Sequence, residues 1–139
     1  MSRASLTRAV GFSAAHRYHR PDWTEEENRR VFGKCANAPG HGHNYRCEVT
    51  VEGTVDPGTG MVVDLGELDR VLEEQVSGPM DHAFLNELPE FREQGRIPTT
   101  EELARVIWER VGPRLPEGCE LARVRVREDR DLWSDYEGG

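Results

Sequence analysis

The sequence has few cysteines and no long apolar run. Three of its 139 residues are cysteines, an odd number that gives no disulfide framework and favours a reducing compartment. No stretch of apolar residues approaches the roughly 20 that cross a membrane as a helix. The first residues, Met-Ser-Arg-Ala-Ser, contain no apolar signal region. We therefore expect a soluble cytoplasmic protein.

Basic side chains are also in short supply. The chain has 26 acidic and 18 basic side chains and a formal net charge of −8. Nucleic acid and anionic membrane surfaces attract basic patches, so neither is an expected partner. Seventeen of the basic residues are arginine and one is Lys34. Arginine suits bidentate contacts with carboxylate or phosphate.

One group of basic residues lies close together in the sequence: Arg17, Arg20, Arg29, Arg30 and Lys34. Two interpretations stay open. The group could attract an anionic substrate against the negative charge of the whole chain. It could equally neutralise the acidic residues at positions 22 and 25–27 beside it.

The length fits one domain, 1–139. The hydrophobic content is only 36%, which is low for a chain that must build its own core. A small domain with a lean core often completes its burial by oligomerising. We therefore expect a homo-oligomer.

Alternating and helical patterns predict an α+β fold. Apolar residues alternate with polar ones over 6–16, 41–51 and 120–128, as in a sheet with one wet face. A turn over 56–60 precedes a short apolar stretch at 61–63, which predicts a fourth, returning strand. Capping boxes at Asp64 and Thr99 predict two amphipathic helices, ended by Gly78-Pro79 and Gly112-Pro113.

Three histidines form a candidate metal site. His41 and His43 are two residues apart and so point to the same face of a strand. His16 ends the apolar face of the first strand. Burial would keep the imidazoles neutral and able to ligate. Three neutral imidazoles without a fourth protein ligand describe a catalytic zinc site with an open position.

Other candidate residues surround these histidines in the sequence. Cys35 precedes His41 closely, and Lys34 and the nearby arginines would favour its thiolate. Asp81 precedes His82, and a carboxylate can orient an imidazole for acid–base work. Glu128 falls on the apolar side of the last strand. It is either a buried functional acid or a wet residue at a fraying strand end.

The motifs together resemble the 6-pyruvoyl-tetrahydropterin synthase and 6-carboxy-tetrahydropterin synthase family. They are Phe32-Gly-Lys-Cys35, Gly40-His-Gly-His-Asn-Tyr45, Asp56-Pro-Gly-Thr-Gly-Met-Val-Val63, Met80-Asp-His82, Thr99-Thr-Glu101 and Val124-Arg-Val-Arg-Glu128. They follow in family order, and the resemblance runs from about Phe12 to Glu128.

The resemblance implies a role for each motif. His16, His41 and His43 would be zinc ligands, Cys35 the catalytic thiol, and Asp81 and His82 a catalytic pair. Glu128 would anchor the pterin, beside a pocket lined by Thr99, Thr100 and Glu101. The family fold is the tunnelling fold, a four-stranded antiparallel sheet with two helices on one face. Its trimers close into a barrel and usually stack as hexamers, with active sites between subunits.

The resemblance also implies a reaction. The substrate would be 7,8-dihydroneopterin triphosphate, and a zinc-dependent lyase would eliminate triphosphate and give 6-pyruvoyl-tetrahydropterin. The nearest rival is the 6-carboxy-tetrahydropterin synthase of queuosine biosynthesis, which also releases acetaldehyde. Five residues separate Cys35 from His41, as in the pyruvoyl branch. A non-enzymatic zinc-binding protein is a third alternative, which a fourth protein ligand would favour.

Overall fold

The structure is a computed structural model that describes residues 2–139. Its strands are β1 (Arg3–His16), β2 (His41–Thr54), β3 (Ala83–Phe84), β4 (Cys119–Asp129) and β5 (Leu132–Tyr136). Its α-helices are α1 (Glu25–Phe32), α2 (Leu65–Leu72), α3 (Gly78–Met80), α4 (Pro89–Arg92) and α5 (Thr100–Val111). None of the helices described is both long enough and apolar enough to cross a membrane.

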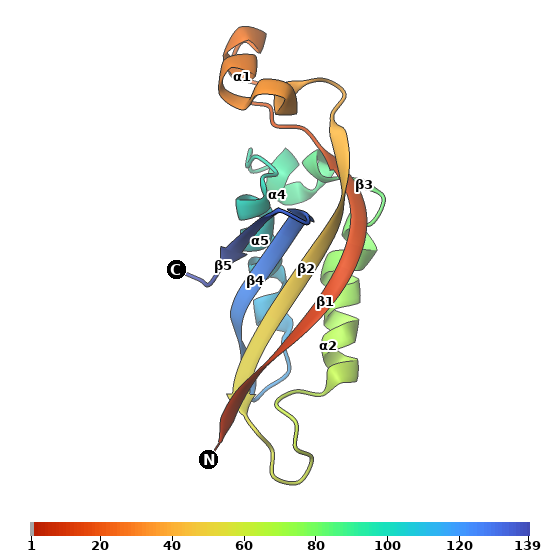
Figure 1. Cartoon of the computed structure of the whole chain (residues 1–139), viewed down its shortest axis with the longest axis vertical. Helices are drawn as coiled ribbons and strands as arrows, with labels where there is room; N and C mark the ends of the chain where they lie inside the picture. The colour runs from red at the N-terminus through yellow and green to blue at the C-terminus, as the bar shows by residue number, and fades with distance from the viewer. Residues whose placement is uncertain (1) are drawn as a thin grey trace.

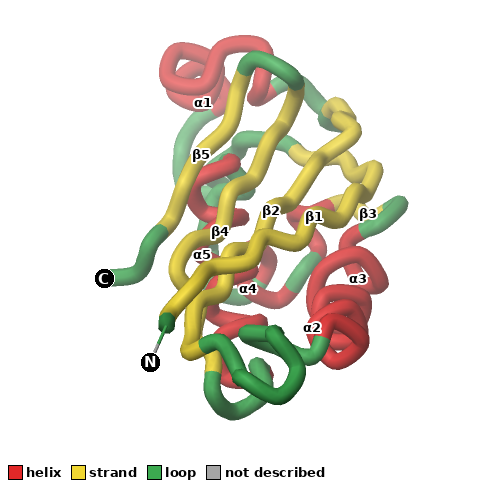
Figure 2. Tube along the Cα trace, turned by 60° about the horizontal axis from the view of Figure 1, so that its bottom comes forward, coloured by secondary structure: helices red, strands yellow, loops and turns green. Residues whose placement is uncertain are grey.

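The strands form one mixed sheet in the order β3-β1-β2-β4-β5. β1 and β2 pair antiparallel over their whole length, and β4 and β5 extend the sheet antiparallel beyond β2. β3 pairs with β1 in parallel. Helices α2 to α5 cover one face of the sheet, and the other face carries no helix (Figures 1 and 2).

The core lies between the sheet and these helices. The predicted alternation is confirmed, since Cys47, Val49 and Val51 of β2 are fully buried. Leu68 and Leu103 meet them from α2 and α5. Each such side chain contributes roughly 1.5–3 kcal/mol by leaving water. This packing supports β1 and β2, and both carry candidate metal ligands at one end.

The predicted four-stranded antiparallel sheet is wrong in two respects. Residues 61–63 form no strand, although the backbone N–H of Asp56 donates to the carbonyl of Met61 and closes the preceding turn at 3.0 Å. The sheet instead gains β3 and β5, which gives five strands. β3 has only two residues, too few for a sequence pattern to reveal.

The helices are also more numerous than the two expected. The predicted end of the first helix at Gly78-Pro79 is wrong, because a π-helical turn (Glu73–Ser77) continues α2 into α3. Pro79 is tolerated there because it occupies the first turn of α3. The second helix is confirmed as α5, with the Thr99 hydroxyl accepting from the Glu102 N–H at 3.1 Å. α1, capped by Thr24, lies beyond the ends of β1 and β2 (Figure 1).

Candidate functional site

The three histidines converge at one end of the β1–β2 pair. The register sets His16 opposite His41 and Ala14 opposite His43, so all three imidazoles share the helix-covered side. One ring nitrogen from each lies within 4.8 Å of the other two. Gly40 makes this close approach possible, since a Cβ there would stand 2.8 Å from the His16 carbonyl oxygen. The structure therefore brings together the predicted ligand set.

Two neighbours fix the orientation of His16. Its Nδ1 lies 2.8 Å from the Pro98 carbonyl oxygen and 3.0 Å from the Tyr45 hydroxyl. A carbonyl accepts only, so Nδ1 carries the proton and Nε2 keeps its lone pair. The side chain is fully buried, and burial lowers the pKa of His16 to about 4, with His41 and His43 adding smaller effects in the same direction. The expected neutral imidazole is confirmed at this position.

The free nitrogens fit a metal ion. His16 Nε2 and His41 Nε2 are 3.1 Å apart, and two nitrogens bound tetrahedrally to zinc lie about 3.3 Å apart. His43 Nε2 is buried and has no hydrogen-bond partner among the described residues. A buried polar atom without a partner is costly, and a metal ion would satisfy it. Three imidazoles of this kind suit zinc among the common metals.

Glu128 reaches the same cluster from β4. The register shifts between Arg127 and Asp129, and this irregularity lies where Glu128 turns toward the histidines. Its Oε1 is 3.3 Å from His16 Nε2 and 3.4 Å from His43 Nε2, and its side chain is only 11% exposed. The interpretation of Glu128 as a solvent-exposed residue at a fraying strand end is therefore wrong.

Cys35 lies next to the triad. It lines a hollow of about 330 Å³ together with Lys34, Asn37, Gly40 and His41. Its carbonyl accepts from the backbone N–H of Tyr18 at 2.9 Å, which ties its loop to the end of β1. The expected thiolate is not favoured in the single chain, because burial and then Glu128 raise the pKa of Cys35. A bound divalent cation would oppose both effects.

Two tyrosines in the site were missed by the sequence analysis. The ring of Tyr18 packs edge-on against His16, with centroids 5.1 Å apart. Burial raises the pKa of Tyr18, and the charges of Glu128, Cys35 and Glu101 raise it further. Tyr45 shares a strand face with His41 and His43, as the alternation in the sequence predicts, but its hydrogen bond to His16 was not foreseen.

The segment from Thr99 to Glu101 lies beside the cluster through its neighbour Pro98. Thr99 caps α5. Thr100 is buried, and its hydroxyl lies 2.6 Å from the Ser134 hydroxyl and 3.0 Å from the Glu101 carboxylate. The two threonine side chains thus form hydrogen bonds within the chain, and Glu101 is the exposed member of the segment.

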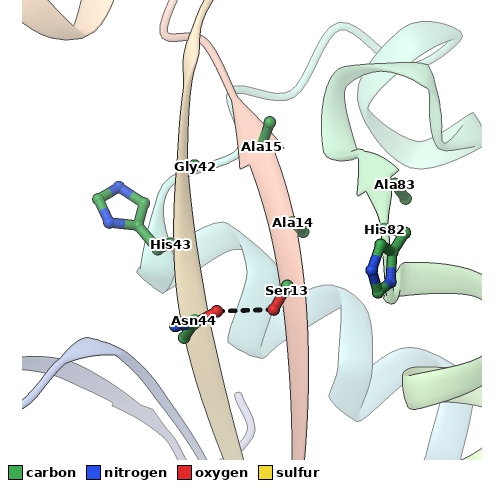
Figure 3. Close-up of a pocket in the computed structure, with 8 residues that line it drawn as sticks. All are labelled: Ser13, Ala14, Ala15, Gly42, His43, Asn44, His82 and Ala83. Carbon is green, nitrogen blue, oxygen red and sulfur yellow. Dashed lines mark hydrogen bonds between the residues drawn. The ribbon is translucent and has the colours of Figure 1, made fainter.

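The side chains of Asp81 and His82 lie away from the cluster formed by the three histidines, Cys35 and Glu128. The Asp81 carboxylate is 3.0 Å from His82 Nδ1 and accepts from the Ser13 backbone N–H at 2.9 Å. Figure 3 shows His82 and His43 on opposite sides of the β1–β2 pair. The His82 side chain is 83% exposed. One chain therefore assembles the triad, Cys35 and Glu128, and it leaves the Asp81–His82 pair outside that cluster.

Comparison with known proteins agrees with this arrangement. The family model described as 6-pyruvoyl tetrahydropterin synthase matches residues 5–139. The human 6-pyruvoyl tetrahydrobiopterin synthase is 41% identical over 137 residues, which cover 98% of this chain and 92% of the human protein. The solved structure of the Caenorhabditis elegans 6-pyruvoyl tetrahydropterin synthase superposes with a TM-score of 0.91 at 34% identity, covering 100% of this chain and 98% of that one.

A relative from the other branch matches less of the chain. The Archaeoglobus fulgidus protein named putative 6-carboxy-5,6,7,8-tetrahydropterin synthase is 36% identical over 102 residues, 73% of this chain and 77% of that protein. The match to the human pyruvoyl enzyme is both longer and closer. With its three converging histidines at the end of β1 and β2, the chain belongs to the 6-pyruvoyl tetrahydropterin synthase family.

Proposed function

We propose that the protein is a zinc-dependent lyase that converts 7,8-dihydroneopterin triphosphate to 6-pyruvoyl-tetrahydropterin and releases triphosphate. The observation that carries this proposal is the convergence of three ring nitrogens beside a thiol and a buried carboxylate. The relatives named as 6-pyruvoyl synthases support it. The reaction needs no redox cofactor, because the oxidised side chain and the reduced ring belong to one molecule.

Glu128 would hold the pterin ring. A carboxylate accepts two parallel hydrogen bonds from the exocyclic amino group and ring N–H of a pterin. Its low exposure keeps water from competing for these donors. The exposed carboxylate of Glu101 and the segment of Thr99 and Thr100 would line the same pocket.

His16, His41 and His43 would hold the zinc ion. When bound, zinc would polarise the side-chain hydroxyls of the substrate and make their protons and the adjacent C–H protons more acidic. Cys35 would then remove a side-chain proton as the general base. His82, oriented by Asp81, would carry protons as acid and base.

The separation of Cys35 from His82 supports a site shared between chains. Each chain presents the triad and Cys35 on one part of its surface and the exposed His82 on another. We propose that trimers close into a barrel and that two trimers form a hexamer, so that His82 of one chain completes the site of the next.

The test is the metal dependence of triphosphate release. The zinc-loaded protein should release triphosphate from 7,8-dihydroneopterin triphosphate, the chelated protein should not, and added zinc should restore the release. The His41→Ala variant should contain no stoichiometric zinc and remain inactive. Full release by the chelated protein would refute the proposed role of the metal.

The second candidate is the 6-carboxy-tetrahydropterin synthase reaction on the same substrate, with acetaldehyde released as well. The similarity to the Archaeoglobus protein favours it to a smaller degree. The five residues between Cys35 and His41 favour the pyruvoyl reaction.

A further inference from the structure

We infer that Lys34, Arg17 and Arg29 form a triphosphate subsite that extends from the Cys35 hollow into the hollow next to it. This inference rests on the proposed function, because it assigns one part of that substrate to particular side chains. Two observations carry it. Some cations of the chain lack a carboxylate partner among the described residues, and these cations lie close to the candidate site.

Most basic side chains are paired. Twelve of the eighteen have a carboxylate oxygen within 4.0 Å, as counted from the ion pairs of the described residues. Arg20 belongs to this group, since it binds Asp22 at 2.9 Å. No ion pair within residues 2–139 involves the remaining six, which are Arg17, Arg29, Arg30, Lys34, Arg114 and Arg123. Four of the six fall between positions 17 and 34, although the chain has an excess of acids.

Unpaired cations in an acidic chain need an explanation. Of this basic group, Arg20 forms an ion pair with an acidic neighbour, and the other four form none with a described acid. Acidic residues at 25–27 are close in sequence, yet none comes within 4.0 Å of these cations. Cations that are left without a carboxylate while acids are abundant are free to bind an anion.

Three of the four cations face two adjoining hollows. Lys34 lines the hollow that also contains Cys35 and His41. Arg17 and Arg29 line a second hollow of about 370 Å³, and Asn37 borders both. The Arg17 Nε donates to the Ala36 carbonyl at 2.8 Å, which holds the guanidinium against the loop between the hollows.

The chemistry of the substrate matches this layout. In 7,8-dihydroneopterin triphosphate the phosphate ester is on the last carbon of a three-carbon side chain whose hydroxyls would face the triad. The triphosphate must therefore begin within a few bonds of the metal and extend away from the pterin. Lys34 lies beside His41, where the ester would begin, and Arg17 and Arg29 lie further along. Guanidinium groups bind phosphate oxygens in bidentate fashion.

One acidic residue opposes the anion. Glu25 also lines the second hollow, and it forms no ion pair with a described cation. Its charge repels a phosphate and weakens the subsite. A Glu25→Gln variant should therefore bind triphosphate more tightly than the wild type, a result that damage to the fold would not produce.

Calorimetry with inorganic triphosphate and the zinc-loaded protein tests the subsite. Arg17→Gln, Arg29→Gln and Lys34→Gln should each weaken binding about tenfold, the effect of losing one charged hydrogen bond. Arg30→Gln is the matched control, since Arg30 is also unpaired on α1 but lines neither hollow, and its affinity should stay within about twofold. Triphosphate chelates metals, so the zinc content of each sample is measured before and after titration.

A second ligand separates charge recognition from structural damage. Binding of 7,8-dihydroneopterin, which has no phosphate, should be the same in the wild type and in all of these variants. An equal loss for both ligands, an equal loss in Arg30→Gln, or no binding of triphosphate to the wild type would each overturn the subsite. Wild-type protein that binds triphosphate as described but does not turn over the substrate would refute the proposed function and leave the anion subsite standing.

Discussion

His16 is the residue whose state depends most on its surroundings. It is fully buried, and its Nδ1 is held by the Pro98 carbonyl. Protonation would place a charge next to two other imidazoles in a buried site. The pKa of about 4, against an ordinary 6.5, expresses this penalty. The same environment that keeps His16 ready to bind a metal ion therefore makes the metal-free protein sensitive to acid.

The pKa of His16 predicts a loss of stability on acidification. Between pH 6.5 and about 4, His16 is protonated in the unfolded chain but not in the folded chain. The free energy of unfolding is therefore highest above this range and falls as the pH is lowered through it. For the metal-free protein, the free energy of unfolding should drop by about 2 kcal/mol between about pH 7.5 and pH 5 from this residue alone. Urea unfolding at both pH values measures it. His16→Asn should lack this component, and an unchanged pH dependence in that variant would contradict the assignment.

Cys35 carries a second prediction at the residue scale. Cys35→Ala should keep its zinc, because the three imidazoles are intact, and it should lose turnover by about 10²- to 10⁴-fold, the usual contribution of a general base. Metal analysis and a triphosphate-release assay measure the two quantities. Cys119→Ala is the matched control, since the Cys119 thiol lies at the start of β4, away from the histidines, and donates a hydrogen bond to the Pro116 carbonyl at 3.4 Å. Full turnover by Cys35→Ala would remove the thiol from the mechanism.

The candidate ligands could be predicted from the sequence because strand periodicity fixes which residues share a face. His41, His43 and Tyr45 follow this rule in β2. Glu128 follows it in β4, although only the structure shows how close its carboxylate comes to His16. Pro98 could not be predicted, because it is 82 residues from His16 and contacts it through a backbone carbonyl. The pKa of Cys35 was misjudged because burial and Glu128 outweigh the nearby cations.

At the scale of elements, α4 and α5 are joined by one well-formed ion pair. Arg110 of α5 binds both carboxylate oxygens of Glu90, each at 2.7 Å, and donates to the Gln75 carbonyl at 3.3 Å. The two side chains are only 15% and 17% exposed. The guanidinium lowers the pKa of Glu90, as a paired carboxylate requires. This contact fixes the helix layer that supports β1 and β2.

Replacing Arg110 tests that link. Arg110→Lys keeps the charge but removes the bidentate geometry, and we expect a loss of about 1–2 kcal/mol in the free energy of unfolding. Arg3→Lys is the control, because the Arg3–Glu120 pair is exposed and should contribute nothing measurable. Denaturant unfolding compares the two variants. Equal stability of both variants with the wild type would mean that packing alone holds α4 to α5.

The long elements were predictable and the short ones were not. β1, β2 and α5 span enough residues for a period to appear and for a capping residue to mark an end. β3 depends on parallel pairing with the distant Ala14 and Ala15. Residues 61–63 have a strand-like composition but no partner strand, so tertiary context overrides their propensity.

At the scale of the whole molecule, the proposed oligomer would account for the bare face of the sheet and the exposed His82. The face opposite the helices carries no covering element (Figure 2). Leu132 and Trp133 on the edge strand β5 are about half exposed, at 48% and 44%. In the proposed trimer, pairing of sheets between neighbouring chains would cover this edge and place His82 of one chain near Cys35 of the next.

Mixed oligomers test the shared site. Cys35→Ala and His82→Gln should each be inactive, and the two variants refolded together in equal amounts should regain activity. Roughly one site in four would then contain both native residues, if chains mix at random and each site is built from two neighbours. Separate samples of each variant, refolded in the same way, are the control. No recovery in the mixture would show that each chain supplies both residues to its own site.

The central claim is that this fold eliminates triphosphate and leaves a pyruvoyl side chain. The most direct measurement is the mass of the pterin formed when the zinc-loaded protein is incubated with 7,8-dihydroneopterin triphosphate. The account predicts the mass of 6-pyruvoyl-tetrahydropterin with free triphosphate. The mass of the carboxy product together with acetaldehyde would contradict it and assign the protein to the other branch of the family.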